Sequence, residues 1–106
     1  MRLIKNEELK NMMEMHVPFV LIDARSHEEY EKGHLPGAES IPSYHLGKQV
    51  LNRHKKTDTI VTYCTDFDCE ASTIAARKLE NLGFTRVVEF KGGIKDWKEA
   101  GYPIEK

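Results

Sequence analysis

The segment from Thr59 to Ser72 constrains the fold more than any other part of the sequence. An apolar, β-branched run ends at Cys64, and a short polar loop follows it. Beyond the loop, apolar residues recur at helical spacing, at Ala71, Ile74, Ala75, Leu79 and Leu82. This pattern predicts a strand that ends at Cys64, then a loop, then a helix from Ala71 to about Leu82.

Cys64 should face the first turn of that helix. The first N–H groups of a helix have no partners within the helix, and the helix dipole is positive there. Both properties favour a thiolate, a persulfide or a bound oxyanion. Cys64 is therefore our candidate nucleophile, and the alternative is an inert cysteine that packs as a small apolar residue.

The rest of the chain alternates between short apolar runs and helical patterns. We expect further strands at Leu3-Ile4, Phe19–Ile22, Ala38–Ile41 and Arg86–Phe90. We expect four more helices. Asn6 caps the first, the second runs from about His27 to Lys32, Ser43 caps the third, and the last carries Ile94, Trp97 and Ala100 on one face. This alternation predicts an α/β domain with a mainly parallel sheet.

Three polar or glycine-rich segments follow predicted strands: Asp23–Arg25, Cys64 and Gly92-Gly93. Ligands of parallel α/β sheets bind beyond the C-terminal ends of the strands. We therefore expect these segments to meet at one edge of the sheet.

The bulk composition fits one domain over residues 1–106. A net charge of −1 gives no indication of binding to nucleic acid or to a membrane. The first residues become acidic and helical too early for a signal peptide. Two cysteines in such a chain favour a reducing, cytoplasmic compartment over a disulfide scaffold.

Several motifs resemble those of rhodanese-like sulfurtransferase domains. Residues 23–38, followed by Ile41-Pro42, resemble the first signature of that family, and Tyr63-Cys64 resembles its active-site entry. The matches further along are Ala75-Ala76, Leu79, Gly83-Phe84, Val87, Gly92-Gly93, Trp97, Gly101 and Pro103. The resemblance implies a three-layer α/β/α domain with a five-stranded, mainly parallel sheet.

The resemblance also implies an activity and a set of site residues. Cys64 would accept a sulfane sulfur as a persulfide and pass it to a thiol, cyanide or a protein acceptor. Asp23 and Arg25 would form a charged or hydrogen-bonded pair that fixes the edge of the sheet. We expect no cofactor, and no metal, because two thiolates without nearby histidines are too few ligands.

The substrate-binding loop would comprise Thr65, Asp66, Phe67, Asp68, Cys69, Glu70 and Ala71. Short relatives usually have an Arg five positions after the cysteine, where this chain has Cys69. If Ser72 matches the Ser that enters the helix in those relatives, the loop is two residues longer and Ala71 replaces the Arg. A rhodanese-like subgroup has a Cys-x4-Cys loop of this kind.

Cys69 has two interpretations. It packs under the loop, which we take as the expectation, or it is a second thiol that attacks a persulfide or disulfide on Cys64. The Cα separation that would decide between them cannot be obtained from the sequence.

The loop carries Asp66, Asp68 and Glu70 and no basic residue. These carboxylates oppose ionisation of Cys64 and repel a dianion, so we expect thiosulfate to be a poor donor. A persulfidated protein or a small thiol persulfide is the expected partner.

Two other function classes remain open. A phosphatase or arsenate reductase of related architecture needs an Arg to close the loop around an oxyanion, and Glu70 and Ala71 occupy its place. A non-catalytic interaction module would not need Cys64.

Overall fold

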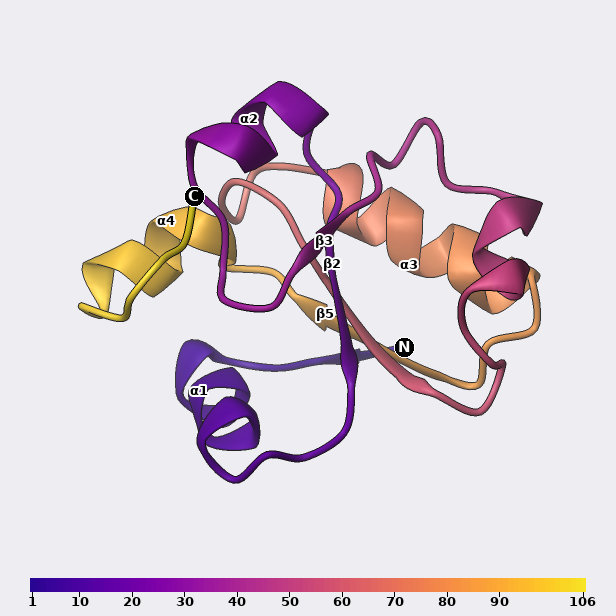
Figure 1. Ribbon diagram of the computed structural model, residues 1–106, viewed down its shortest axis with the longest axis horizontal. Helices are drawn as coiled ribbons and strands as arrows, with labels where there is room; N and C mark the ends of the chain where they lie inside the picture. Colours follow the sequence, from indigo (N-terminus) through magenta and orange to yellow (C-terminus); the bar gives the residue numbers. More distant parts are fainter.

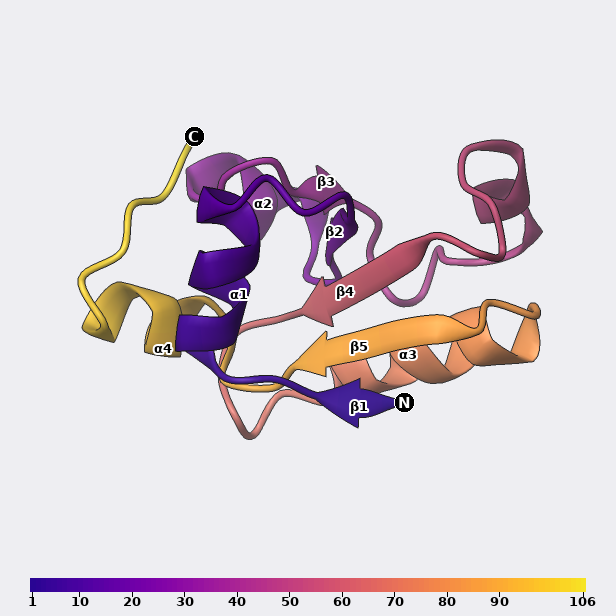
Figure 2. The same cartoon turned by 90° about the horizontal axis from the view of Figure 1, so that it is seen from below.

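The computed structural model describes residues 1–106, and all five strands of its single sheet run parallel, as expected. The strands are β1 (Arg2–Leu3), β2 (Val20–Asp23), β3 (Glu39–Ser40), β4 (Thr59–Tyr63) and β5 (Arg86–Phe90). Their order across the sheet is β1-β5-β4-β2-β3, so β4 is central. Figure 2 shows β4, β5 and β1 side by side, pointing in one direction.

Helices cover both faces of the sheet. They are α1 (Asn6–Glu14), α2 (His27–Lys32), α3 (Ala71–Asn81) and α4 (Gly93–Glu99), with a 3-10 helix, η1 (Lys48–Asn52). Apolar residues of α1 and α4 pack on one face, and those of α3 and η1 pack on the other (Figures 1 and 2). This is the expected three-layer arrangement. None of the helices combines the length and the apolar character that crossing a bilayer requires.

The helix α2 forms where the sequence predicts it. The Ser26 hydroxyl accepts a hydrogen bond from the backbone N–H of Glu29 at 3.2 Å, which is the N-cap half of a capping box. The helix ends at Lys32, and Gly33 follows it. Both ends of this helix therefore coincide with signals in the local sequence.

The prediction of a helix that begins at Ser43 is wrong. The chain forms a turn after Pro42, which accepts hydrogen bonds from His45 and Leu46, and then becomes extended at Gly47. Only the short η1 follows. Leu46 and Val50 are buried as expected, whereas Leu51 is exposed.

Asn6 also differs from its expected role. It is the first residue of α1, and Lys5 precedes it as the N-cap. The Asn6 side chain instead donates a hydrogen bond to Asp96 of α4 at 3.0 Å. It therefore links the two helices on that face.

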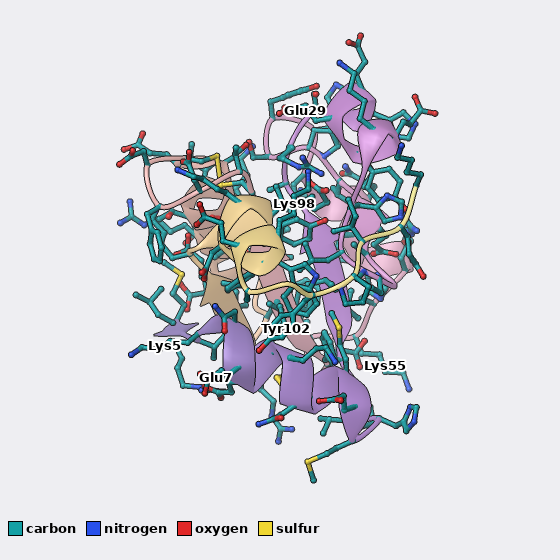
Figure 3. The ribbon with its side chains drawn as sticks, turned by 90° about the vertical axis from the view of Figure 1, so that its left-hand side faces the viewer. Lys5, Glu7, Glu29, Lys55, Lys98 and Tyr102 are labelled. Carbon is teal, nitrogen blue, oxygen red and sulfur yellow. A yellow bond between two sulfur atoms is a disulfide. The ribbon has the colours of Figure 1, made fainter.

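The C-terminal segment returns across the same face. Figure 3 shows Tyr102 near α1, and the Lys10 ammonium lies 5.4 Å from the centre of its ring. Glu105 then pairs with His34, beyond α2, in an antiparallel bridge. This segment covers the α1–α4 face and ends beside α2 (Figure 1).

Candidate active site

Cys64 lies directly after β4, at the C-terminal edge of the sheet. Its carbonyl oxygen accepts a hydrogen bond from the N–H of Ile94, and the carbonyl of Thr65 accepts one from Lys95, both at 3.0 Å. The first turn of α4 therefore holds two successive peptide carbonyls, those of Cys64 and Thr65. The Cys64 side chain is fully buried.

The expected pair of Asp23 and Arg25 is present at this edge. The Arg25 side chain donates to both carboxylate oxygens of Asp23, with the shortest distance 2.8 Å, and to the carbonyl of Gly33. The Tyr63 hydroxyl donates to Asp23 at 2.7 Å and accepts from the N–H of Leu35. This cluster ties the end of β2 to the end of β4, one residue before Cys64.

Burial and charge shift two pKa values in this cluster. Burial opposes the charge on Arg25, but the hydrogen bond and the charge of Asp23 outweigh it and raise the pKa of Arg25. Burial also raises the pKa of Tyr63 far above its ordinary value, and the Asp23 carboxylate adds to this effect. The cluster therefore stays as an ion pair with a neutral phenol.

The Cys64 sulfur lies against the first turn of α3, as expected. It is 3.3 Å from the Ser72 hydroxyl oxygen. Ser72 in turn donates to the Glu89 carboxylate at 2.6 Å, and Thr73 donates to the same oxygen at 2.7 Å. Cys64, Ser72 and Glu89 are all buried. A chain of polar groups thus leads from the sulfur into the β5–α3 interface.

The structure corrects the expected role of Cys69. Its sulfur does not simply pack under the loop, because it forms a disulfide with Cys64, with the two Cα atoms 6.4 Å apart. That separation is within the usual range for disulfides. Cys69 therefore brings a second sulfur into direct contact with the first.

Backbone hydrogen bonds shape the loop between the two cysteines. The Asp66 carboxylate accepts from the N–H groups of Asp68 and Cys69, at 3.0 and 3.2 Å. Asp66 and Asp68 line a hollow of about 150 Å³ together with Phe67, Gly92, Lys95, Asp96 and Glu99. Carboxylates therefore outnumber cations at this side of the site.

Glu89 and Lys91 lie beside the two cysteines, although no motif in the sequence pointed to either residue. Glu89 lies two residues after Val87, so strand alternation places it on the face that α3 covers. Lys91 follows β5, and its ammonium donates to the Cys69 carbonyl at 2.9 Å and to Thr73 at 3.1 Å. It also lies 3.8 Å from Glu89. Of these contacts, the sequence could have predicted only the face of the sheet on which Glu89 lies.

Comparisons with known proteins agree with this architecture. The family model for the rhodanese-like domain matches residues 5–100. A crystal structure of the BH2092 protein from Bacillus halodurans superposes with a TM-score of 0.93 and 31% identity, covering 98% of this chain and 76% of that one.

Two curated relatives are similar over most of this chain. The HTH-type transcriptional regulator Rv0324 of Mycobacterium tuberculosis is 35% identical over 81% of it, and the putative sulfur carrier protein YrkF of Bacillus subtilis is 32% identical over 89%. The matches span 37% and 49% of those proteins, so this chain corresponds to half of their length or less. The family match over nearly the whole chain, together with the parallel sheet, places the protein in the rhodanese-like domain family.

Proposed function

We propose that the domain is a sulfurtransferase in which Cys64 carries a sulfane sulfur as a persulfide. The observation that supports this most directly is the contact between the Cys64 sulfur, at the end of the central strand, and Ser72 in the first turn of α3. The unpaired N–H groups and the dipole of that turn stabilise a negative sulfur. A thiolate and a persulfide both benefit from this position.

The transfer needs the reduced protein and no added cofactor. The Cys64 thiolate attacks the outer sulfur of a persulfide donor, and the donor leaves as a thiol or thiolate. In a second step an acceptor thiol or cyanide attacks the outer sulfur on Cys64, which leaves again as a thiolate. Each step exchanges one bond to sulfur for another.

Ser72 and Glu89 give the buried thiol a route for its proton. Because Ser72 donates its own hydrogen to Glu89, its oxygen presents a lone pair to Cys64. The Glu89 carboxylate in turn contacts Thr73 and Lys91, and both of these residues are only partly buried. A proton that leaves Cys64 can therefore reach the protein surface without direct contact between the sulfur and water.

We propose a persulfidated thiol or protein as the donor, with thiosulfate a poor substitute. Asp66, Asp68, Asp96 and Glu99 surround the hollow beside the loop, and Lys95 is the cation in its lining. Lys91 is engaged by the Cys69 carbonyl and Thr73 and lies near Glu89. The name of the relative YrkF, a putative sulfur carrier protein, supports a protein partner in sulfur transfer.

Mass spectrometry after donor treatment tests the proposal. The protein is reduced with dithiothreitol, freed of reductant, and incubated with glutathione persulfide. The Cys69→Ser variant should gain the mass of one sulfur atom on the peptide that contains Cys64. The Cys64→Ser variant should gain none on that residue and should transfer no sulfur to cyanide. Equal transfer by Cys64→Ser and by the wild type would refute the proposed function.

A further inference from the structure

The disulfide between Cys64 and Cys69 shows where a nucleophile from the loop attacks. The Cys69 sulfur is bonded to the Cys64 sulfur itself. In a persulfide on Cys64, that atom is the inner sulfur. A nucleophile at this position therefore displaces the outer sulfur, which is the one that was loaded.

Contacts that do not involve its sulfur hold Cys69 in place. Its N–H donates to the backbone carbonyl and to the carboxylate of Asp66, both at 3.2 Å. Its carbonyl accepts from Lys91 at 2.9 Å. All the donors and acceptors of these bonds remain when the disulfide is reduced. Cys69 is therefore held close to Cys64 as a neighbouring thiol, and an attack within the loop has a high effective concentration.

The two sulfurs also differ in accessibility. Cys64 is fully buried, whereas Cys69 is partly exposed. An external thiol therefore reaches the disulfide at the Cys69 sulfur, and Cys64 is the leaving group. A thiolate stabilised by the first turn of α3 leaves readily. Reduction in this direction regenerates the nucleophile that accepts sulfur.

We propose that the domain is a sulfide-releasing persulfide reductase, in which Cys69 resolves the persulfide on Cys64. The Cys69 thiolate attacks the Cys64 sulfur, forms the disulfide, and breaks the bond to the outer sulfur. The outer sulfur takes the bonding electron pair and the proton that came from Cys69, and it leaves as hydrosulfide. The sulfane sulfur is reduced by two electrons, and the two cysteine sulfurs supply them.

An external dithiol completes the cycle. It opens the disulfide by two thiol–disulfide exchanges, returns both cysteines to the thiol form, and becomes a disulfide itself. This inference rests on the proposed loading of Cys64, and it adds a fate for the loaded sulfur when no acceptor is present.

Single-turnover experiments test this step. Reduced wild type, Cys69→Ser and Cys64→Ser are freed of reductant, treated anaerobically with a limiting amount of glutathione persulfide, and followed by mass spectrometry and a sulfide assay. The wild type should release sulfide in an amount equal to the disulfide that forms. Cys69→Ser should keep its persulfide at least about tenfold longer, because the intramolecular attack is lost. Cys64→Ser should form neither persulfide nor sulfide above the donor blank.

The outcomes separate the two proposals. If Cys69→Ser is loaded but the wild type holds its persulfide equally long and releases no sulfide, the reductase inference fails and the loading of Cys64 stands. If Cys69→Ser is never loaded although its folding is intact by circular dichroism, both proposals fail. The spent wild type is then reduced with dithiothreitol, freed of it, and given a second limiting portion of glutathione persulfide, which should restore a second round of sulfide release. Without such recovery, the disulfide is an end product and the cycle is refuted.

Discussion

Gly93 packs against the backbone of Cys64. A Cβ atom at residue 93 would lie 2.5 Å from the Cys64 carbonyl oxygen, and Gly93 has a φ of +69°. No other side chain can replace a hydrogen here without moving the cysteine backbone. The close approach lets the next residue, Ile94, donate its N–H to that same carbonyl.

Gly93→Ala should therefore lower stability and disturb the site together. The left-handed backbone conformation costs an alanine about 1–2 kcal/mol, and the clash adds about 1–3 kcal/mol. Gly101→Ala is the matched control, since Gly101 has a φ of +82° and nothing lies within 4 Å of its Cβ position. Urea unfolding and persulfide loading measure both effects. Equal losses in the two variants would show that the contact with Cys64 contributes nothing.

Ser72→Ala should slow persulfide loading without preventing folding. It removes the hydroxyl between Cys64 and Glu89 and so interrupts the route for the thiol proton. We expect the loading rate to fall by about tenfold or more. Thr73→Ala is the comparison, because Thr73 also donates to Glu89 but forms no hydrogen bond with Cys64, and without it Lys91 still lies 3.8 Å from Glu89 at the outer end of the route. Stopped-flow loading rates across pH make the comparison, and similar losses in both variants would contradict the relay.

Tyr63→Phe should change how stability depends on pH. The pKa of Tyr63 is raised in the folded protein, so its contribution is fully present below the ordinary value, about 10, and falls as pH rises above it. In the variant this fall should be smaller, and the part that remains comes from Tyr30, whose pKa burial also raises. Below pH about 10 the variant should be less stable by about 1–3 kcal/mol, because Asp23 and Leu35 lose a buried hydrogen-bond partner.

Urea unfolding at several pH values above and below this point provides the measurement. Tyr44→Phe is the control for tyrosine ionisation, since Tyr44 is 61% exposed. That control should lose stability at alkaline pH to the same extent as the wild type. A fall of equal size in Tyr63→Phe would mean that other groups cause it.

Asp66→Asn combined with Asp68→Asn should improve transfer from thiosulfate. Asn at position 66 keeps a side-chain oxygen for the two loop N–H groups, so the loop shape is retained. Two fewer carboxylates should raise thiosulfate turnover about tenfold at low salt, where 1.4 kcal/mol corresponds to that factor. The cyanide assay measures it at low and high ionic strength. Glu14→Gln, which removes a carboxylate at the far end of α1, should give no gain. If the loop variant gains nothing at any salt concentration, loop shape sets donor choice.

Local signals explain which parts of the fold the sequence predicted. The run Arg86–Phe90 and the helix α2 have the predicted bounds, and β4 ends at Tyr63, one residue before the predicted end at Cys64. Each of these signals lies in neighbouring residues. The prediction from Ser43 failed because an extended Gly47 interrupts a pattern that is otherwise helical.

The site required contacts between distant residues. Cys64 was identifiable from its position between strand and helix. Cys69 was identifiable as a possible second thiol, but its contact with Cys64 was not, since the bend at Asp66 and the contact from Lys91 decide where that sulfur lies. Lys91 is 22 residues beyond Cys69 in the sequence, and only the pairing of β4 with β5 brings it near the loop.

Apart from the disulfide to Cys69, the contacts that hold the Cys64 backbone come from outside residues 66–70. The first turn of α4 holds the Cys64 and Thr65 carbonyls, and the Asp23–Arg25–Tyr63 cluster holds the strand end before them. Residues 66–70 supply none of these bonds. The length and charge of this segment can therefore change, in evolution or by engineering, while the backbone contacts that position Cys64 are kept.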